Sequence, residues 1–234
     1  MQKYSIRHLA FVTAALAFAF AAWDATGLDV ALAHLSGSRA GFPLRDNALL
    51  YNVIHEGGRR LAWLAAVALC IGVWWPFGWL TRLSASQRLQ LAVTTLLALF
   101  AVSAIKSLTG ISCPWDEAQF GGSARHASHW VRMFQADGGS GRCFPAGHAS
   151  GGFAFIGGWF AFRSVDRQIA RRWLAAALAA GFLFGIAQQL RGAHYMSHTL
   201  WTLWLCWATA LAMEAAWHTL YRRLDASPQA GAMT

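Results

Sequence analysis

The sequence predicts an all-α polytopic membrane protein, a bundle of six transmembrane helices with a lid loop on its outer side. Of its 234 residues, 56% are hydrophobic and only 12% are charged. Six uncharged runs are each about long enough to cross roughly 30 Å of hydrocarbon as a helix. Two long loops, about 24–60 and 106–144, lie between these runs, and the other connections are short. We therefore expect residues 1–234 to form one integral-membrane domain.

The expected spans are Leu9–Trp23, Leu61–Leu80, Leu89–Ile105, Cys143–Phe162, Trp173–Leu190 and Tyr195–Met213. The first is short unless it continues past Asp24, and a basic start followed by "AFAFAA" would also suit a secretory signal peptide. We expect this segment to be retained as a helix. Basic residues in the short connections favour cytoplasmic termini, because the positive-inside rule discounts long loops.

The first long loop contains "FPLRDNALLYNVIHEGGRRLAWL", in which apolar residues recur at helical spacing: Leu49, Leu50, Val53 and Ile54. The pattern is typical of an interfacial amphipathic helix that leads into the second span. His55 and Glu56 at its end could contact a substrate, but we expect a surface role for both.

The second long loop combines glycines, aromatic residues and clustered acids in "CPWDEAQFGG", "HASHW" and "DGGSGRC". Such a composition is more typical of a lid or binding loop than of a linker. Cys113 and Cys143 both lie in this loop, on the side where disulfides form, so we expect them to pair. Cys70 and Cys206 fall within apolar runs and are expected to be packing residues.

The net charge of +9 is explained by membrane topology and by attraction to anionic lipid headgroups. Zinc-finger spacing, a P-loop and a basic-aromatic strand pattern are all missing from the sequence, so nucleic acid is not an expected partner. The C-terminal "ASPQAGAMT" is expected to be disordered.

Charged and titratable residues gather at three predicted helix ends on one face of the membrane. They are Lys106 after the third span, Arg142 to His148 at the fourth, and Arg191, His194 and His198 at the sixth. Such groups at a membrane boundary are costly enough to suggest function. Taken singly, each basic residue could instead be an interfacial side chain that reaches the headgroups.

The stretch "PAGHASGG" at the fourth span suits a phosphate group. Pro145 fits the first turn of a helix, and Gly147 lets a ligand approach the backbone closely. Free amides at a helix start attract anions. Lys106, Arg142 and Arg191 could add charge-assisted hydrogen bonds to phosphate oxygens.

Three histidines could supply nucleophilic and acid-base chemistry. His194 and His198 are four residues apart and share one face of a helix. With His148 from another helix end, one ring could attack phosphorus while another protonates the leaving oxygen. The alternative is that all three are ordinary hydrogen-bonded histidines at helix ends.

The order and spacing of these residues resembles the three signatures of the type-2 phosphatidic acid phosphatase superfamily, K-x6-RP, PSGH and SR-x5-H-x3-D. Lys106 is followed after six residues by Cys113 and Pro114, residues 145–148 form "PAGH", and His194 is followed after three residues by His198. The similarity extends over about 106–198, and six spans would fit its integral-membrane members.

The resemblance implies roles for individual residues. His194 would be the nucleophile that forms a phosphohistidine, and His148 the general acid for the leaving group. Lys106 and the amides around Gly147 would bind the phosphate. It further implies an outward-facing site that needs no metal or other cofactor.

The chain departs from the family pattern at several positions. Cys113 replaces an arginine, Ala146 a serine and His198 the aspartate that orients the nucleophile, while the Ser-Arg pair falls on Ala187 and Gln188. Other residues could take over these functions. Arg191 and Arg142 could supply the missing positive charges, and Ser150 or Ser197 the missing hydroxyl. His198 could accept a hydrogen bond from His194, or Asp116 or Glu117 could provide the carboxylate.

These observations favour a lipid phosphatase or phosphotransferase of a bacterial inner membrane that acts at the periplasmic face of the cell envelope. Expected substrates are undecaprenyl pyrophosphate, lipid A phosphate and glycerophospholipid phosphates, and membrane lipids are the other expected partners. One alternative is a metal- or haem-binding membrane protein that uses His148, His194 and His198. Another is a lipid-binding relative that has lost catalysis, motivated by the departures from the family pattern.

Overall fold

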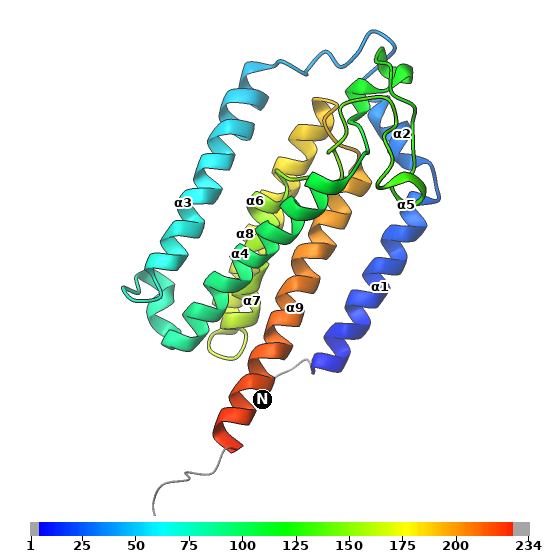
Figure 1. Ribbon diagram of the computed structural model, residues 1–234. Coiled ribbons are helices and arrows are strands. Elements are labelled where there is room, and N and C mark those ends of the chain that lie inside the picture. Colours follow the sequence, from blue (N-terminus) through cyan, green and yellow to red (C-terminus); the bar gives the residue numbers. More distant parts are fainter. Residues whose placement is uncertain (1–4, 227–234) are drawn as a thin grey trace, which may run out of the picture.

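The computed structural model describes residues 5–226, without the side chains of 221–226, and is largely helical (Figure 1). Its α-helices are α1 Ile6–Asp24, α2 Leu28–Ala33, α3 Gly58–Ile71, α4 Ala85–Leu108, α5 His129–Arg132, α6 Ser150–Phe153, α7 Gly157–Phe162, α8 Arg167–Leu190 and α9 Met196–Ala226. Shorter helical segments of other types are η1 Leu49–Gly57, η2 Gly78–Arg82, η3 Pro114–Asp116, η4 Ala118–Phe120 and η5 Ala154–Ile156. The described range holds isolated bridges but no β-strand. Residues 227–234 of the predicted disordered tail lie outside it.

The bundle is built around α9, which packs along α1 and α4, and around α8, which packs on α6 and α7. Its core holds fully buried side chains from several helical segments, among them Val102 of α4, Phe153 of α6 and Ile156 of η5. The α6 and α8 backbones approach closely, because a Cβ on Gly152 would lie 2.1 Å from the Gly181 nitrogen. Small residues at such crossings let apolar helices pack tightly in a membrane.

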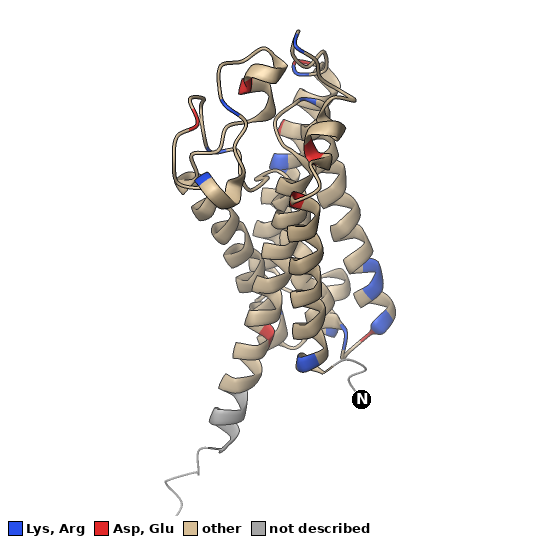
Figure 2. Ribbon diagram, turned by 90° about the vertical axis from the view of Figure 1, so that its right-hand side faces the viewer, with Lys and Arg blue, Asp and Glu red and all other residues tan. Residues whose placement is uncertain are grey.

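Within the described residues, three helices are long and apolar enough to cross a membrane, namely α1, α4 and α8. Their outer surfaces are apolar, as shown by the exposed rings of Phe11 on α1 and Phe100 on α4. In Figure 2, Lys, Arg, Asp and Glu lie mostly towards the two ends of the bundle. The described part of the chain therefore has the character of a membrane-associated helical bundle.

At the other three expected spans, the helices begin or end at residues other than those predicted. The second was expected over Leu61–Leu80, but α3 ends at Ile71, ahead of Pro76, which interrupts helical hydrogen bonding. The fourth was expected over Cys143–Phe162, but helix begins only at Ser150 and passes through a 3₁₀ turn between α6 and α7. The sixth is continuous and longer than expected, since α9 extends to Ala226.

The first long loop folds back onto the bundle. The predicted amphipathic helix is present as η1, a π-helix that continues directly into α3. Leu49 and Val53 are exposed on it, as expected for an interfacial helix. Phe42 of the same loop packs with Phe120 and Tyr195, so this loop contacts both the second long loop and the start of α9.

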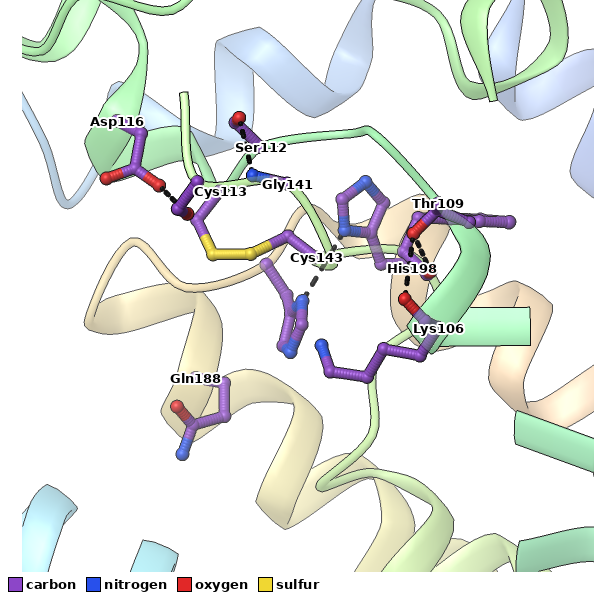
Figure 3. Close-up of a disulfide and its surroundings, with 12 residues drawn as sticks. Lys106, Thr109, Ser112, Cys113, Asp116, Gly141, Cys143, Gln188 and His198 are labelled. Carbon is purple, nitrogen blue, oxygen red and sulfur yellow. Dashed lines mark hydrogen bonds between the residues drawn. A yellow bond between two sulfur atoms is a disulfide. The ribbon is translucent and has the colours of Figure 1, made fainter. Parts of the chain in front are cut away.

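The second long loop is closed by a disulfide and held over one end of the bundle by polar contacts. Cys113 and Cys143 form a disulfide (Figure 3). At the end of α1, the Asp24 carboxylate accepts hydrogen bonds from the indoles of Trp130 in the loop and Trp201 in α9, at 2.7 and 2.8 Å. His129 lies 3.2 Å from the same carboxylate. The loop, α1 and α9 thus meet at one buried acid.

Candidate active site

The "PAGH" segment lies in a turn that is docked against α9. The Ala146 amide donates to the carbonyl of His198, and the Thr202 hydroxyl donates to the carbonyl of Ala146. Ala146, where the family has serine, is fully buried in this contact. The expectation that Pro145 begins the helix is wrong, because the helix starts five residues later, at Ser150. The turn brings the second signature directly to the third.

Gly147 makes room for Lys106. A Cβ at Gly147 would lie 3.3 Å from the Lys106 Cδ atom, so the lysine stem passes directly over the glycine. In Figure 3 a dashed line connects His198 to a second imidazole, which has no label. The amino group of Lys106 points from the end of α4 towards this second ring. Lys106 interacts electrostatically with His148, His194 and His198. The lysine of the first signature therefore lies among the histidines of the other two.

His194 and His198 form a buried pair at the start of α9. Their Nδ1 atoms are 3.5 Å apart, and 5% and 2% of these residues are exposed. The turn before them has Gly192 at a φ of 77°, where a Cβ would also collide with the ring of Phe42. The Cys143 backbone interacts with both histidines. With Nδ1 of His194 directed at His198, Nε2 is the nitrogen left for nucleophilic attack.

His148 lies against a histidine from a different part of the chain. The rings of His55 and His148 are 3.7 Å apart between centroids and tilted by 32°. The buried Nε2 atom of His148 has no hydrogen-bond partner among the described residues. The preferred surface role for His55 is therefore wrong. Its neighbour Glu56 lies 3.3 Å from Nδ1 of His55 and pairs with Arg59 at 2.7 Å.

Several positive charges surround His148. Lys106, Arg59 and Arg191 all interact with it electrostatically. Arg191 is 5% exposed, and its Nε atom donates to the Arg45 carbonyl at 2.8 Å. Its guanidinium also donates to Gln188, the residue at the family's arginine position, at 3.1 Å. Arg191 thus places a charge about one helical turn from the position where the family has it.

Other expected substitutes are engaged elsewhere. Glu117 accepts a hydrogen bond from Tyr195 at 2.8 Å and lies 3.0 Å from His126, and Asp116 accepts one from Ser140 at 2.6 Å. The carboxylates of the lid are therefore directed to partners other than His194. Beside Glu117, the pKa of His126 is raised by their hydrogen bond.

The hydroxyls of Ser150 and Ser197 and the side chain of Arg142 also do not take the places of the missing family residues. Ser150 donates to the Gly147 carbonyl at 2.6 Å, while the buried Ser197 hydroxyl has no partner within the described residues. Arg142 is exposed on the lid at a φ of 59°, and its side chain does not line the groove beside His148. The structure brings Lys106, Gly147, His148, Arg191, His194 and His198 together, and it leaves Arg142 apart.

A groove of about 430 Å³ reaches three residues of this group, Lys106, Gly147 and His148, whereas Arg191, His194 and His198 do not line it. Its polar end is formed by Lys106, Gly147, His148 and Arg59. The rest is apolar and runs between α3, α4 and α8, with Trp63, Leu96, Leu99, Phe100 and Phe184 in its walls. The groove therefore joins a cationic end to an apolar surface of the bundle.

The geometry does not gather a set of metal ligands. Within residues 5–226, no three His, Cys, Asp or Glu side chains are placed to hold one metal ion. The neighbours of His148 are cations, which disfavour a metal at that position. The arrangement suits an anion better.

Comparison with known families agrees with the signatures. The model of the PAP2 superfamily matches residues 87–222, more than half of the chain. The chain belongs to the PAP2 superfamily. The match runs from α4 into α9 and includes every signature residue. Searches of curated proteins and of solved structures found no match. Membership assigns this PAP2 protein to phosphatase-type chemistry on phosphate esters.

Sequence reasoning missed Arg59 and undervalued His55. His55 lies near the end of η1 and Arg59 in the first turn of α3, both within "HEGGRR". Their only sequence signal is the density of charged residues immediately before an apolar span. The ring contact of His55 with His148 and the electrostatic interaction of Arg59 with His148 depend on how η1 and α3 are rotated against the turn before α6.

Proposed function

We propose that this protein is a membrane lipid phosphatase or phosphotransferase that acts on a lipid phosphate or pyrophosphate through a phosphohistidine. The observation that carries the proposal is that Lys106 and His148 line the polar end of an apolar groove, and that Lys106 also interacts with the buried pair His194–His198. The cations would bind the phosphate, and the groove would take the acyl or prenyl chain.

In the proposed first step, Nε2 of His194 attacks phosphorus, and the bond from phosphorus to the leaving oxygen breaks. His148 would be protonated in the substrate complex, where the negative phosphate offsets the cations around it, and it gives its proton to that oxygen. In the second step, neutral His148 takes a proton from a water molecule that attacks phosphorus, and the phosphorus–nitrogen bond breaks. A lipid hydroxyl in place of water would make the same protein a phosphotransferase.

His198 would replace the carboxylate of the family. Its Nδ1 can accept a hydrogen bond from Nδ1–H of His194 when His198 carries its proton on Nε2. This fixes the tautomer of His194 and leaves Nε2 as the nucleophile. A neutral ring stabilises the developing imidazolium less than a carboxylate does, so we expect a slower enzyme than one with aspartate at this position.

We further propose six membrane crossings in one domain, with the site at the periplasmic face of a bacterial inner membrane. The disulfide between Cys113 and Cys143 supports an oxidising compartment for the lid. Crossings by α3, by the segment α6 to α7 and by α9 would complete the three spans of α1, α4 and α8.

The test is phosphate release by the purified full-length protein from undecaprenyl pyrophosphate, lipid A phosphate, phosphatidylglycerol phosphate and phosphatidic acid, with EDTA present. Replacement of the nucleophile in His194→Ala should lower the rate about 10⁴-fold or more, since the covalent step is lost. No release from any lipid by the wild-type protein would favour the lipid-binding relative that has lost catalysis. Release that His194→Ala leaves unchanged would refute the mechanism.

A further inference from the structure

A second cavity lies near the opposite end of the bundle, between α1, α7, α8 and α9. Its volume is about 420 Å³. It lies beside the start of α8, whereas Arg191 of the candidate active site directly follows the end of that 24-residue helix. On this helix the cavity is lined as far as Leu174 and the groove by Phe184, ten residues further on, so roughly 15 Å of helix separates the two.

Basic side chains form the polar part of this second cavity: His8, Arg163, Arg167 and Arg171. Arg167 and Arg171 are one turn apart on α8, and both are exposed. Arg163 is buried and fixed by Glu214 at 2.8 Å and by the ring of Trp159. None of the described residues that line the cavity is acidic. A negative group would therefore meet the exposed guanidinium groups of Arg167 and Arg171 and no acidic side chain in the described lining.

The remaining lining is apolar and lies along the membrane-crossing part of the bundle. Leu9 and Val12 come from α1, Leu174 from α8 and Trp207 from α9, and Trp159 lies between them and the arginines. A cavity with cations at one end and an apolar wall beyond them complements an amphiphile with an anionic headgroup. Basic pockets between transmembrane helices are a known form of phospholipid site.

Arg172 provides an internal comparison. It is adjacent to Arg171 on α8 and exposed, but it does not line the cavity. Arginines that serve only membrane topology would be equivalent at these positions, because the positive-inside rule counts charge and ignores the face of the helix. Arg167 and Arg171 line the cavity and Arg172 does not, so a role in topology alone does not explain the position of the first two.

We propose that this cavity binds one anionic glycerophospholipid, with its phosphate between Arg167 and Arg171 and an acyl chain against Trp159 and Trp207. The site would lie in the membrane leaflet opposite the candidate active site. It would hold α1 against α7 and α8 from the side. The proposal is independent of the catalytic mechanism.

The experiment is native mass spectrometry of the full-length protein, purified in detergent with equal amounts of phosphatidylglycerol and phosphatidylcholine. The wild-type protein should retain phosphatidylglycerol preferentially, and the double variant Arg167→Gln/Arg171→Gln should retain it about tenfold less. Arg172→Gln, with half the charge change on the same helix, and Lys106→Gln, in the candidate active site, should retain it as the wild type does. Millimolar inorganic phosphate should not displace the lipid.

Three outcomes would overturn the proposal. The first is equal retention by the wild type and the double variant. The second is loss of lipid in Lys106→Gln alone, which would place the lipid in the candidate active site. The third is displacement by inorganic phosphate, which would indicate an anion site without lipid specificity. Because a misfolded variant would also lose lipid, the double variant must keep the melting temperature of the wild type in phosphatidylcholine alone.

Discussion

The two sides of the candidate active site differ in their surroundings. At the start of α9, His194 and His198 are almost completely buried and face each other. At the turn before α6, His148 lines the groove and is surrounded by His55, Lys106, Arg59 and Arg191. A nucleophile benefits from a fixed orientation, whereas a proton donor must reach the substrate oxygen. The difference therefore fits a division into nucleophile and acid.

The largest expected effect comes from changing the partner of His194. His198→Ala removes the acceptor at Nδ1 and should lower kcat about 100-fold, because the ring loses its fixed tautomer. His198→Asp supplies the carboxylate of the family and should raise kcat about tenfold above the wild type, by better stabilising the imidazolium. Both are measured as phosphate release. An aspartate variant slower than His198→Ala would show that His198 does not orient the nucleophile.

A smaller effect is expected from filling the space over Gly147. In Gly147→Ala the new methyl group would press on the Lys106 stem at 3.3 Å and move its amino group. We expect KM for the lipid phosphate to rise about tenfold, which corresponds to about 1.4 kcal/mol of binding. Gly57→Ala is the control, because its methyl group would make only an ordinary contact with the Asn52 carbonyl at 3.5 Å, and Gly57 does not line the groove. Equal effects of the two variants would contradict a phosphate role for Lys106.

Loss of the ring contact between His55 and His148 should change the kinetics less than the His198 variants or Gly147→Ala. His55→Phe keeps an aromatic ring against His148 and should preserve most of the activity. His55→Ala leaves His148 free to turn, and kcat should fall about fivefold, about 1 kcal/mol of transition-state stabilisation. The comparison is made on kcat with substrate in excess. If the two variants have the same kcat, His55 does not position His148 through its ring.

The smallest effect concerns the lid. The pKa of His126 is raised by its hydrogen bond to Glu117, so the protonated pair stabilises the folded lid fully below about pH 6.5, the ordinary histidine value. This stabilisation is lost as the pH rises through the raised pKa. Since about half of the His126 side chain is exposed, the pair should contribute less than about 1 kcal/mol to the stability of the lid.

The measurement for the lid is amide hydrogen exchange of residues 114–126 at pH 6 and pH 8, corrected for intrinsic exchange rates. Protection should decrease towards pH 8 in the wild type and change little in His126→Asn. A pH dependence that persists in His126→Asn would assign it to another group.

Much of the protein follows from the sequence alone. The apolar runs indicated an all-helical membrane protein, and the signatures indicated the family, which the family match confirmed. Both depend on short-range patterns, namely the composition of a window and the spacing of a few residues. The proximity of Lys106, His148, His194 and His198 was expected for the same reason, because each lies at the end of an apolar run.

Only the tertiary structure decided which neighbours these residues have. The contacts of His148 with His55, of Arg191 with Gln188 and of Glu117 with Tyr195 each join different elements of the chain or depend on how a helix end is turned. The late start of helix at Ser150 was decided in the same way, since the preceding turn is bonded to α9. Local periodicity determines that a helix forms. The rotation and axial position of one helix against another depend on the packing of many side chains at once, and these determine which polar atoms meet.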